Sequence, residues 1–171
     1  MTTAARYCPR CAAHLPGPPP TRCTGCDYAL YVNPRPTGSV IILDGDRFLM
    51  LRRSREPSAG QWDLPGGFCD GWEHPAEAAM REAREELGVD VQLGTFVGMY
   101  VGSYLFQDEA LPVLDSFWLA TIISGEITLD PTEASALAWA DLANPPRMAF
   151  PTMDTALKDA VIRRMSSRFV S

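Results

Sequence analysis

The sequence predicts an α+β sandwich preceded by a small cysteine-bearing segment. Three observations support this: β-rich runs lie on both sides of one short acidic helix, a second helical stripe closes the chain, and two cysteine pairs stand near its start. At 171 residues the chain suits one domain with a small appendage. We expect the appendage to occupy residues 1–36 and the sandwich to occupy residues 37–171.

The first strands are expected to form a hairpin. Apolar runs over 38–43 and 47–53 are separated by Asp44-Gly45-Asp46, which is a turn sequence. A short strand over 62–64 then enters the Pro65-Gly66-Gly67 turn. These runs supply one side of the sandwich.

A helix is predicted between Pro75 and Gly88. Proline suits the first position of a helix and glycine the residue just past its end, so the helix should have about three and a half turns. Glu77, three residues after His74, can turn back on the free amides of the first turn.

The remaining elements are β-rich runs and a closing helix. Strands are expected over 91–106 and 114–124, separated by a polar turn at 107–109, then over 126–129 and 136–140. A final helix is expected over 152–169. Its core stripe comprises Met153, Ala156, Leu157, Ala160, Val161 and Met165.

One face of the first helix is acidic. At 100° per residue, Glu82, Glu85 and Glu86 fall within an arc of about 100°. Such a face is repulsive unless a cation lies on it, and its hard oxygen ligands suit Mg²⁺ or Mn²⁺. Arg81 lies one turn before Glu85 and can hold that carboxylate. The alternative is an exposed helix whose charges serve solubility, but the fixed offsets of Gly67 and Glu73 argue against it.

Residues 67–89 fit the pattern G-x5-E-x7-R-E-U-x-E-E-x-G-U, where U is aliphatic, and in this respect the chain resembles the Nudix hydrolases. The resemblance implies an α/β/α Nudix fold and cleavage of a diphosphate within a nucleotide. It makes Glu82, Glu85 and Glu86, with the carbonyl of Gly66, the ligands of a divalent metal. Glu73 and Arg81 receive supporting roles. A bound metal neutralises the diphosphate and lowers the pKa of a water. The base that takes the proton is one of these three glutamates or Glu133.

Further residues are candidates for substrate contacts. Arg52 and Arg53 end a predicted strand, so one must face away from the core, and either can hold a phosphate. Glu133 is a candidate for metal binding or water activation, or is a solvated loop acid. Five aromatic residues are candidates to stack on a base, with core or rim packing as the alternative for each: Trp62, Trp72, Tyr100, Tyr104 and Phe150.

The N-terminal cysteines form two C-x2-C pairs: Cys8, Cys11, Cys23 and Cys26. Paired C-x2-C knuckles are typical of a ribbon in which four thiolates bind Zn²⁺. Disulfides are the alternative, which the compact spacing and the lack of a signal peptide disfavour. We expect His14 to be a loop residue and Cys69 to be a small buried apolar residue.

Charge limits the partners of the ribbon. Residues 1–36 carry four arginines against Asp27, a net charge of +3. The net charge of the whole chain is −6, so the remaining residues carry −9. A mild excess without interleaved aromatics is not a nucleic-acid footprint. We therefore expect a structural or homodimer-forming ribbon and no nucleic-acid partner.

No apolar stretch is long enough to span a membrane, and a cytoplasmic location is expected.

The ribbon and the junction Tyr31-Val32-Asn33-Pro34-Arg35-Pro36 resemble the NADH pyrophosphatase branch of the Nudix family. The S-Q-P-W-P-F-P signature of that branch does not follow Val89. The implied function is divalent-metal-dependent hydrolysis of a nucleoside diphosphate linked to another group, of the ADP-ribose or NADH type. Two alternatives stay open: a non-catalytic nucleotide-binding module, and a hydrolase of nucleoside triphosphates.

Overall fold

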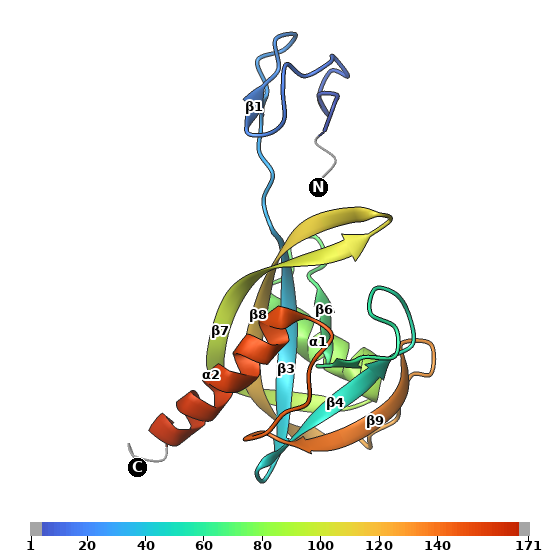
Figure 1. Ribbon diagram of the computed structural model, residues 1–171, viewed down its shortest axis with the longest axis vertical. Coiled ribbons are helices and arrows are strands. Elements are labelled where there is room, and N and C mark those ends of the chain that lie inside the picture. Colours follow the sequence, from blue (N-terminus) through green and yellow to red (C-terminus); the bar gives the residue numbers. More distant parts are fainter. Residues whose placement is uncertain (1–4, 168–171) are drawn as a thin grey trace.

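The computed structural model describes residues 5–167, which form one mixed sheet, two helices and a separate N-terminal segment (Figure 1). The elements in chain order are β1 (Thr21–Arg22), β2 (Ala29–Leu30), β3 (Arg35–Asp44), β4 (Arg47–Arg53), β5 (Trp62–Asp63), β6 (Gly66–Phe68), α1 (Pro75–Leu87), β7 (Asp90–Phe106), β8 (Glu109–Ser124), β9 (Ala134–Asp141) and α2 (Pro151–Ser167).

The main sheet has the strand order β5-β4-β3-β8-β7, with β6 also paired to β3 and β9 to β4. β3 and β8 run parallel, and the other pairs are antiparallel. The parallel register places Thr37 of β3 opposite Asp115 of β8, and β6 lies on the other side of the same part of β3. Three strands therefore meet next to α1.

The two faces of the sheet are both apolar, and each is covered by one helix (Figure 1). Side chains alternate along β3, so that Val40 and Ile42 pack in the layer that contains α1, whereas Ile41 packs in the layer that contains α2. The α1 side of the core includes Ala79, Ala83 and Leu87, and the α2 side includes Met153, Ala156, Leu157 and Ala160. The predicted α+β sandwich is confirmed.

The close approach of α1 to the sheet depends on Gly38. A Cβ at this position would lie 1.9 Å from the carbonyl oxygen of Pro75 and 2.8 Å from the amide nitrogen of Ala79. Both are backbone atoms that cannot move aside, so only glycine lets the first turns of α1 pack on β3. This contact fixes the helix that carries the acidic face.

The ends of α1 are as predicted. The His74 amide donates to the Glu77 carboxylate (3.0 Å), and the Ala76 amide donates to Nδ1 of His74 (3.1 Å), which forms a capping box. Gly88 ends the helix with a φ of +69°.

The prediction of a strand over 126–129 is wrong. Residues 126–130 instead bind the C-terminal end of α1: the Thr128 amide donates to the carbonyl of Leu87 (2.8 Å) and the Asp130 amide donates to that of Glu86 (3.1 Å). The last carbonyls of a helix have no partner within the helix and need donors from elsewhere. The amides of this segment bond to those carbonyls instead of to a neighbouring strand. The segment that follows is thereby held beside the acidic face.

Other differences lie at element ends. β8 begins at Glu109 rather than at 114, and Gly66–Phe68 forms a strand rather than only a turn. Met165 is exposed because the last turns of α2 extend beyond the sheet (Figure 1). Cys69 is partly exposed rather than buried. Positions 168 and 169 of the predicted closing helix lie outside the described residues.

The N-terminal segment has a small core of its own, formed by Cys8, Leu15 and Cys23. Figure 1 shows this segment at one end of the molecule, connected through one extended stretch to β3. Neither of the two helices found in residues 5–167 is long and apolar enough to cross a membrane.

Candidate active site

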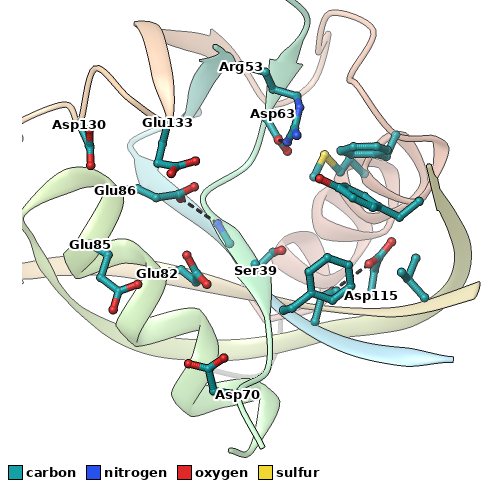
Figure 2. Close-up of a pocket in the computed structure, with 18 of the residues that line it drawn as sticks. Ser39, Arg53, Asp63, Asp70, Glu82, Glu85, Glu86, Asp115, Asp130 and Glu133 are labelled. Carbon is teal, nitrogen blue, oxygen red and sulfur yellow. Dashed lines mark hydrogen bonds and ion pairs between the residues drawn. The ribbon is translucent and has the colours of Figure 1, made fainter. Parts of the chain in front are cut away.

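A cavity with a volume of about 510 Å³ lies beside α1 and reaches across the sheet to the start of α2 (Figure 2). One end is acidic and is lined by Asp70, Glu82, Glu85, Glu86, Asp130 and Glu133. The other end is mainly apolar and is lined by Phe68, Tyr104, Val113, Asp115, Phe150 and Met153. The cavity thus offers two chemically distinct halves to one ligand.

The three glutamates of the predicted acidic face all line the cavity (Figure 2). Burial raises the pKa of Glu86 well above its usual range, and repulsion from Glu82 adds to this effect. Burial likewise raises the pKa of Glu82. Carboxylates held close together in partial burial destabilise one another unless a cation joins them. Their hard oxygen atoms fit a divalent metal such as Mg²⁺ or Mn²⁺.

Gly66 lies next to this group. Its amide donates a 3.0 Å hydrogen bond to the Glu86 carboxylate, and Gly66 lines the cavity. The bond fixes the direction of the Glu86 side chain relative to β6.

Arg81 organises the acidic end. Its Nη1 donates to the carboxylates of Glu82 (2.8 Å) and Glu85 (2.9 Å), so the predicted contact with Glu85 is confirmed. Nε and Nη2 bind both oxygens of Glu73, and Nη2 also donates to the carbonyl of Phe68 (3.0 Å). The hydrogen bonds from Arg81 lower the pKa of Glu73 to about 2. Glu73 and Arg81 therefore form a fixed support under the two cavity glutamates.

Gly67 makes room for Glu82. A Cβ on Gly67 would lie 2.3 Å from Oε1 of Glu82 and 2.6 Å from its Cδ. Any larger residue here would displace the carboxylate from its place between β6 and α1.

Glu133 reaches the acidic end from the loop before β9 (Figure 2). It forms a salt bridge of 2.9 Å with Arg55, and its carbonyl accepts from the Ser54 amide (3.0 Å). Asp130 lies in the same loop and lines the same end of the cavity. The loop between β8 and β9 thus brings two further carboxylates to the site.

The two arginines at the end of β4 are separated by the alternation of the strand. Arg53 lines the cavity, pairs with Asp63, and lies over the Phe150 ring at 5.1 Å from its centroid. Arg52 is exposed and donates to the carbonyl of Gly60 (2.9 Å), and it is not among the cavity-lining residues.

The five aromatic candidates are also divided. Tyr104 and Phe150 line the cavity with ring centroids 5.6 Å apart. Trp62 and Tyr100 pack against the core on the α2 side, and Trp72 is fully exposed. Core packing therefore describes Trp62 and Tyr100, whereas Trp72 contacts neither the core nor the cavity lining.

Several cavity residues were not singled out from the sequence. Asp63, Asp70, Asp115 and Asp130 all line the cavity. Asp115 gave one available signal, because it is the only charged residue between 110 and 125 in an otherwise β-rich run.

The four N-terminal cysteines gather at a single point. All four Sγ atoms lie within 4.8 Å of one another, and the Sγ pairs Cys8–Cys26 and Cys11–Cys23 are 3.7 and 3.6 Å apart. A tetrahedron of thiolates at the usual Zn–S distance has S···S edges of about 3.8 Å. These thiols are free and not disulfide-bonded. The cluster can hold zinc.

Comparison with known proteins agrees with the fold. The NUDIX domain family matches residues 33–163, so the chain belongs to the NUDIX family and is a Nudix pyrophosphohydrolase. The family motif places Glu82, Glu85 and Glu86 on α1, where the structure shows them lining the cavity.

Individual relatives carry different activities in their names. An ADP-ribose pyrophosphatase of Methanocaldococcus jannaschii is 31% identical over 72% of this chain and 71% of its own. The NAD-capped RNA hydrolase NudC of Pseudomonas putida is 30% identical over 84% of this chain, which spans half of that protein. The crystal structure of a MutT NUDIX hydrolase from Burkholderia pseudomallei is 30% identical, with a TM-score of 0.65 over 74% of this chain and 98% of that one. These activities belong to the proteins named, with which this chain shares the NUDIX domain.

Proposed function

We propose that this protein hydrolyses the internal diphosphate of a nucleoside diphosphate linked to a second group, with ADP-ribose or an NADH-type dinucleotide as substrate. The observation that carries the proposal is the convergence of Glu82, Glu85 and Glu86 on a cavity whose other half is apolar and aromatic. Phosphates suit the first half and a nucleoside the second. The similarity to the ADP-ribose pyrophosphatase supports this choice of substrate.

Glu82, Glu85 and Glu86, with the carbonyl of Gly66, are the proposed holders of Mg²⁺ or Mn²⁺. When bound, such an ion neutralises the diphosphate and lowers the pKa of a water. The Arg81 hydrogen bonds to Glu82 and Glu85 keep these carboxylates oriented before substrate arrives.

Two further side chains have proposed roles in the reaction. Glu133 faces the acidic end from outside α1, so it is a candidate base together with the three helix glutamates. Of the two arginines considered for phosphate binding, Arg53 is favoured because it lines the cavity. Arg52 would have to leave its bond to Gly60 to take part.

The cysteine cluster is proposed to bind Zn²⁺ and to have no direct part in hydrolysis. Four thiolates close the coordination shell of zinc and leave no position for a reacting water. Residues 1–36 would then be a structural ribbon or a homodimer contact, and residues 37–171 the hydrolase domain. We propose no nucleic-acid partner for the ribbon, and we propose a cytoplasmic location for the protein.

The experiment is a product analysis. The purified protein is incubated with Mg²⁺ or Mn²⁺ and, separately, with ADP-ribose, NADH or dGTP, and the products are resolved by chromatography. Attack within the internal diphosphate should split ADP-ribose into AMP and ribose 5-phosphate. Consumption of dGTP alone, with release of pyrophosphate, would instead assign the protein to the triphosphate hydrolases. Binding without turnover of any of the three would identify a nucleotide-binding module.

A further inference from the structure

Asp115 lies in the apolar half of the cavity, away from the glutamates of α1 (Figure 2). It is half-buried on β8, directly opposite Thr37 of β3 in the parallel pair. A carboxylate in such surroundings loses hydration and needs hydrogen-bond donors in return.

Two threonines supply some of these donors. Oγ1 of Thr37 donates to Oδ1 of Asp115 (2.8 Å), and Oγ1 of Thr152 donates to Oδ2 (2.7 Å). The hydroxyls come from β3 and from the first turn of α2, so they fix the plane of the carboxylate from two sides. An ionised carboxylate has about four acceptor positions. The two hydroxyls leave acceptor capacity on both oxygens for a ligand.

The walls around Asp115 suit a flat, largely apolar ring. Phe68, Tyr104, Val113, Phe150 and Met153 line this half of the cavity. The Phe68 and Tyr104 rings meet edge to face with centroids 5.3 Å apart. An apolar pocket with one fixed polar group orients its ligand through that group. Because the group here accepts hydrogen bonds only, its complement on the ligand is an N–H or O–H donor, and on a flat base that donor is an N–H.

We propose that Asp115 is a specificity-determining residue that accepts a hydrogen bond from the exocyclic amine of the nucleobase. The proposal rests on the proposed function, because it places the phosphates of the same ligand at the glutamates of α1. A base that presents a carbonyl oxygen in place of the amine sets lone pairs against the carboxylate. Such a base is disfavoured in the same orientation, since neither group can donate and its ring N–H lies at the neighbouring position.

Equilibrium binding of nucleoside monophosphates tests this without turnover. Calorimetry with Mg²⁺ compares AMP with IMP, and CMP with UMP, since each pair exchanges an amine for a carbonyl. A hydrogen bond to a charged group predicts that wild-type protein binds the amine-bearing member at least about 10-fold more tightly in one pair. The pair that shows this difference identifies a purine or a pyrimidine pocket.

The Asp115→Asn variant replaces one acceptor oxygen by an amide donor of the same shape. Its preference should fall to about equal binding of the two members or reverse in favour of the carbonyl. Asp159→Asn is the matched control, because Asp159 also accepts a hydroxyl hydrogen bond (2.7 Å, from Tyr100) but does not line the cavity. This control should keep the wild-type preference.

Three results overturn the proposal: equal binding of both members of each pair by the wild type, no measurable binding of AMP or CMP, or an equal weakening of all four ligands by Asp115→Asn. The last result would mean that Asp115 only ties β3 to α2. If the variant fails to fold, equal wild-type binding within both pairs still overturns the proposal. An amine preference that Asp115→Asn abolishes, found without hydrolysis of ADP-ribose, would leave Asp115 assigned and would reject the proposed reaction instead.

Discussion

The guanidinium of Arg81 holds the carboxylate of Glu73 through two parallel hydrogen bonds, Nε to Oε1 and Nη2 to Oε2, each 2.9 Å long. Glu73 is itself fixed, since its Oε2 accepts from the Asp70 amide (3.0 Å). The remaining nitrogen of Arg81 is therefore directed at Glu82 and Glu85. The planar, fork-like geometry of the guanidinium, rather than its charge alone, places the two cavity carboxylates.

Replacing Arg81 by lysine should lower turnover by about 10- to 100-fold while the protein stays folded. Lysine keeps the charge but cannot bind Glu73 at two points and reach the cavity glutamates at once, and small displacements of catalytic groups are costly. Initial rates and circular dichroism check this. Arg84→Lys on the same helix is the control, because Arg84 pairs with Asp90 outside the cavity. Equal rates for Arg81→Lys and wild type would show that a point charge suffices.

Removing one charge from the acidic face should have a larger effect. Glu85→Gln or Glu86→Gln is expected to lower turnover by at least about 10², since metal binding and charge neutralisation are both weakened. Rates are measured at saturating Mg²⁺. Glu77→Gln, which alters only the helix cap, should leave the rate near that of the wild type. Near-normal rates in both cavity variants would remove the catalytic role of this face.

Gly67→Ala should impair activity more than stability. The added Cβ meets the end of the Glu82 side chain, which can swing away, so the fold survives while the carboxylate leaves its place. We expect a loss of about 10-fold or more in rate. Gly94→Ala on β7 is the control, since its Cβ would meet only the carbonyl oxygen of Leu119 at 3.4 Å. A melting temperature that falls steeply with no loss of specific activity would contradict this explanation.

The parts of the site predicted from the sequence are those encoded locally. Glu82, Glu85 and Glu86 share a face because helical spacing alone puts them there, and the ends of α1 follow from Pro75 and Gly88. The cysteine cluster was likewise indicated by spacing within a short segment. Such features need no knowledge of which strands pair.

The other half of the cavity could not be found in this way. Asp115 meets Thr37 and Thr152 only because β8 pairs in parallel with β3 and α2 returns over the sheet. These contacts join residues 78 and 37 positions apart in the chain. The segment 126–129 has the composition of a strand. It does not form one, because the amides of Thr128 and Asp130 donate to the carbonyls at the C-terminal end of α1. Tertiary contacts decided both cases.

Stability should depend on pH through Tyr100. Burial, together with its hydrogen bond to Asp159, raises the pKa of Tyr100 from 10.0 to about 12. Because the folded pKa is above the unfolded one, this contribution is fully present below pH 10 and is lost as the pH rises toward 12. Denaturant unfolding across that range measures it, and ultraviolet spectra follow phenolate formation. Tyr100→Phe should flatten this part of the profile, and an unchanged slope would reject the assignment.

The last prediction concerns the N-terminal cysteines, whose Sγ atoms are spaced as zinc requires. Metal analysis of purified protein should find about one zinc per chain, and Cys23→Ser should lose most of it, because three thiolates hold the ion less well than four. Cys69→Ser is the control and should keep the zinc, since Cys69 lies outside the cluster. Hydrolysis with Mg²⁺ should change by less than about twofold in both variants, because a closed shell offers no site for a reacting water. Protein without zinc, or a disulfide among these cysteines under reducing conditions, would refute the zinc site; loss of hydrolysis together with the zinc would show that the ribbon supports the active site.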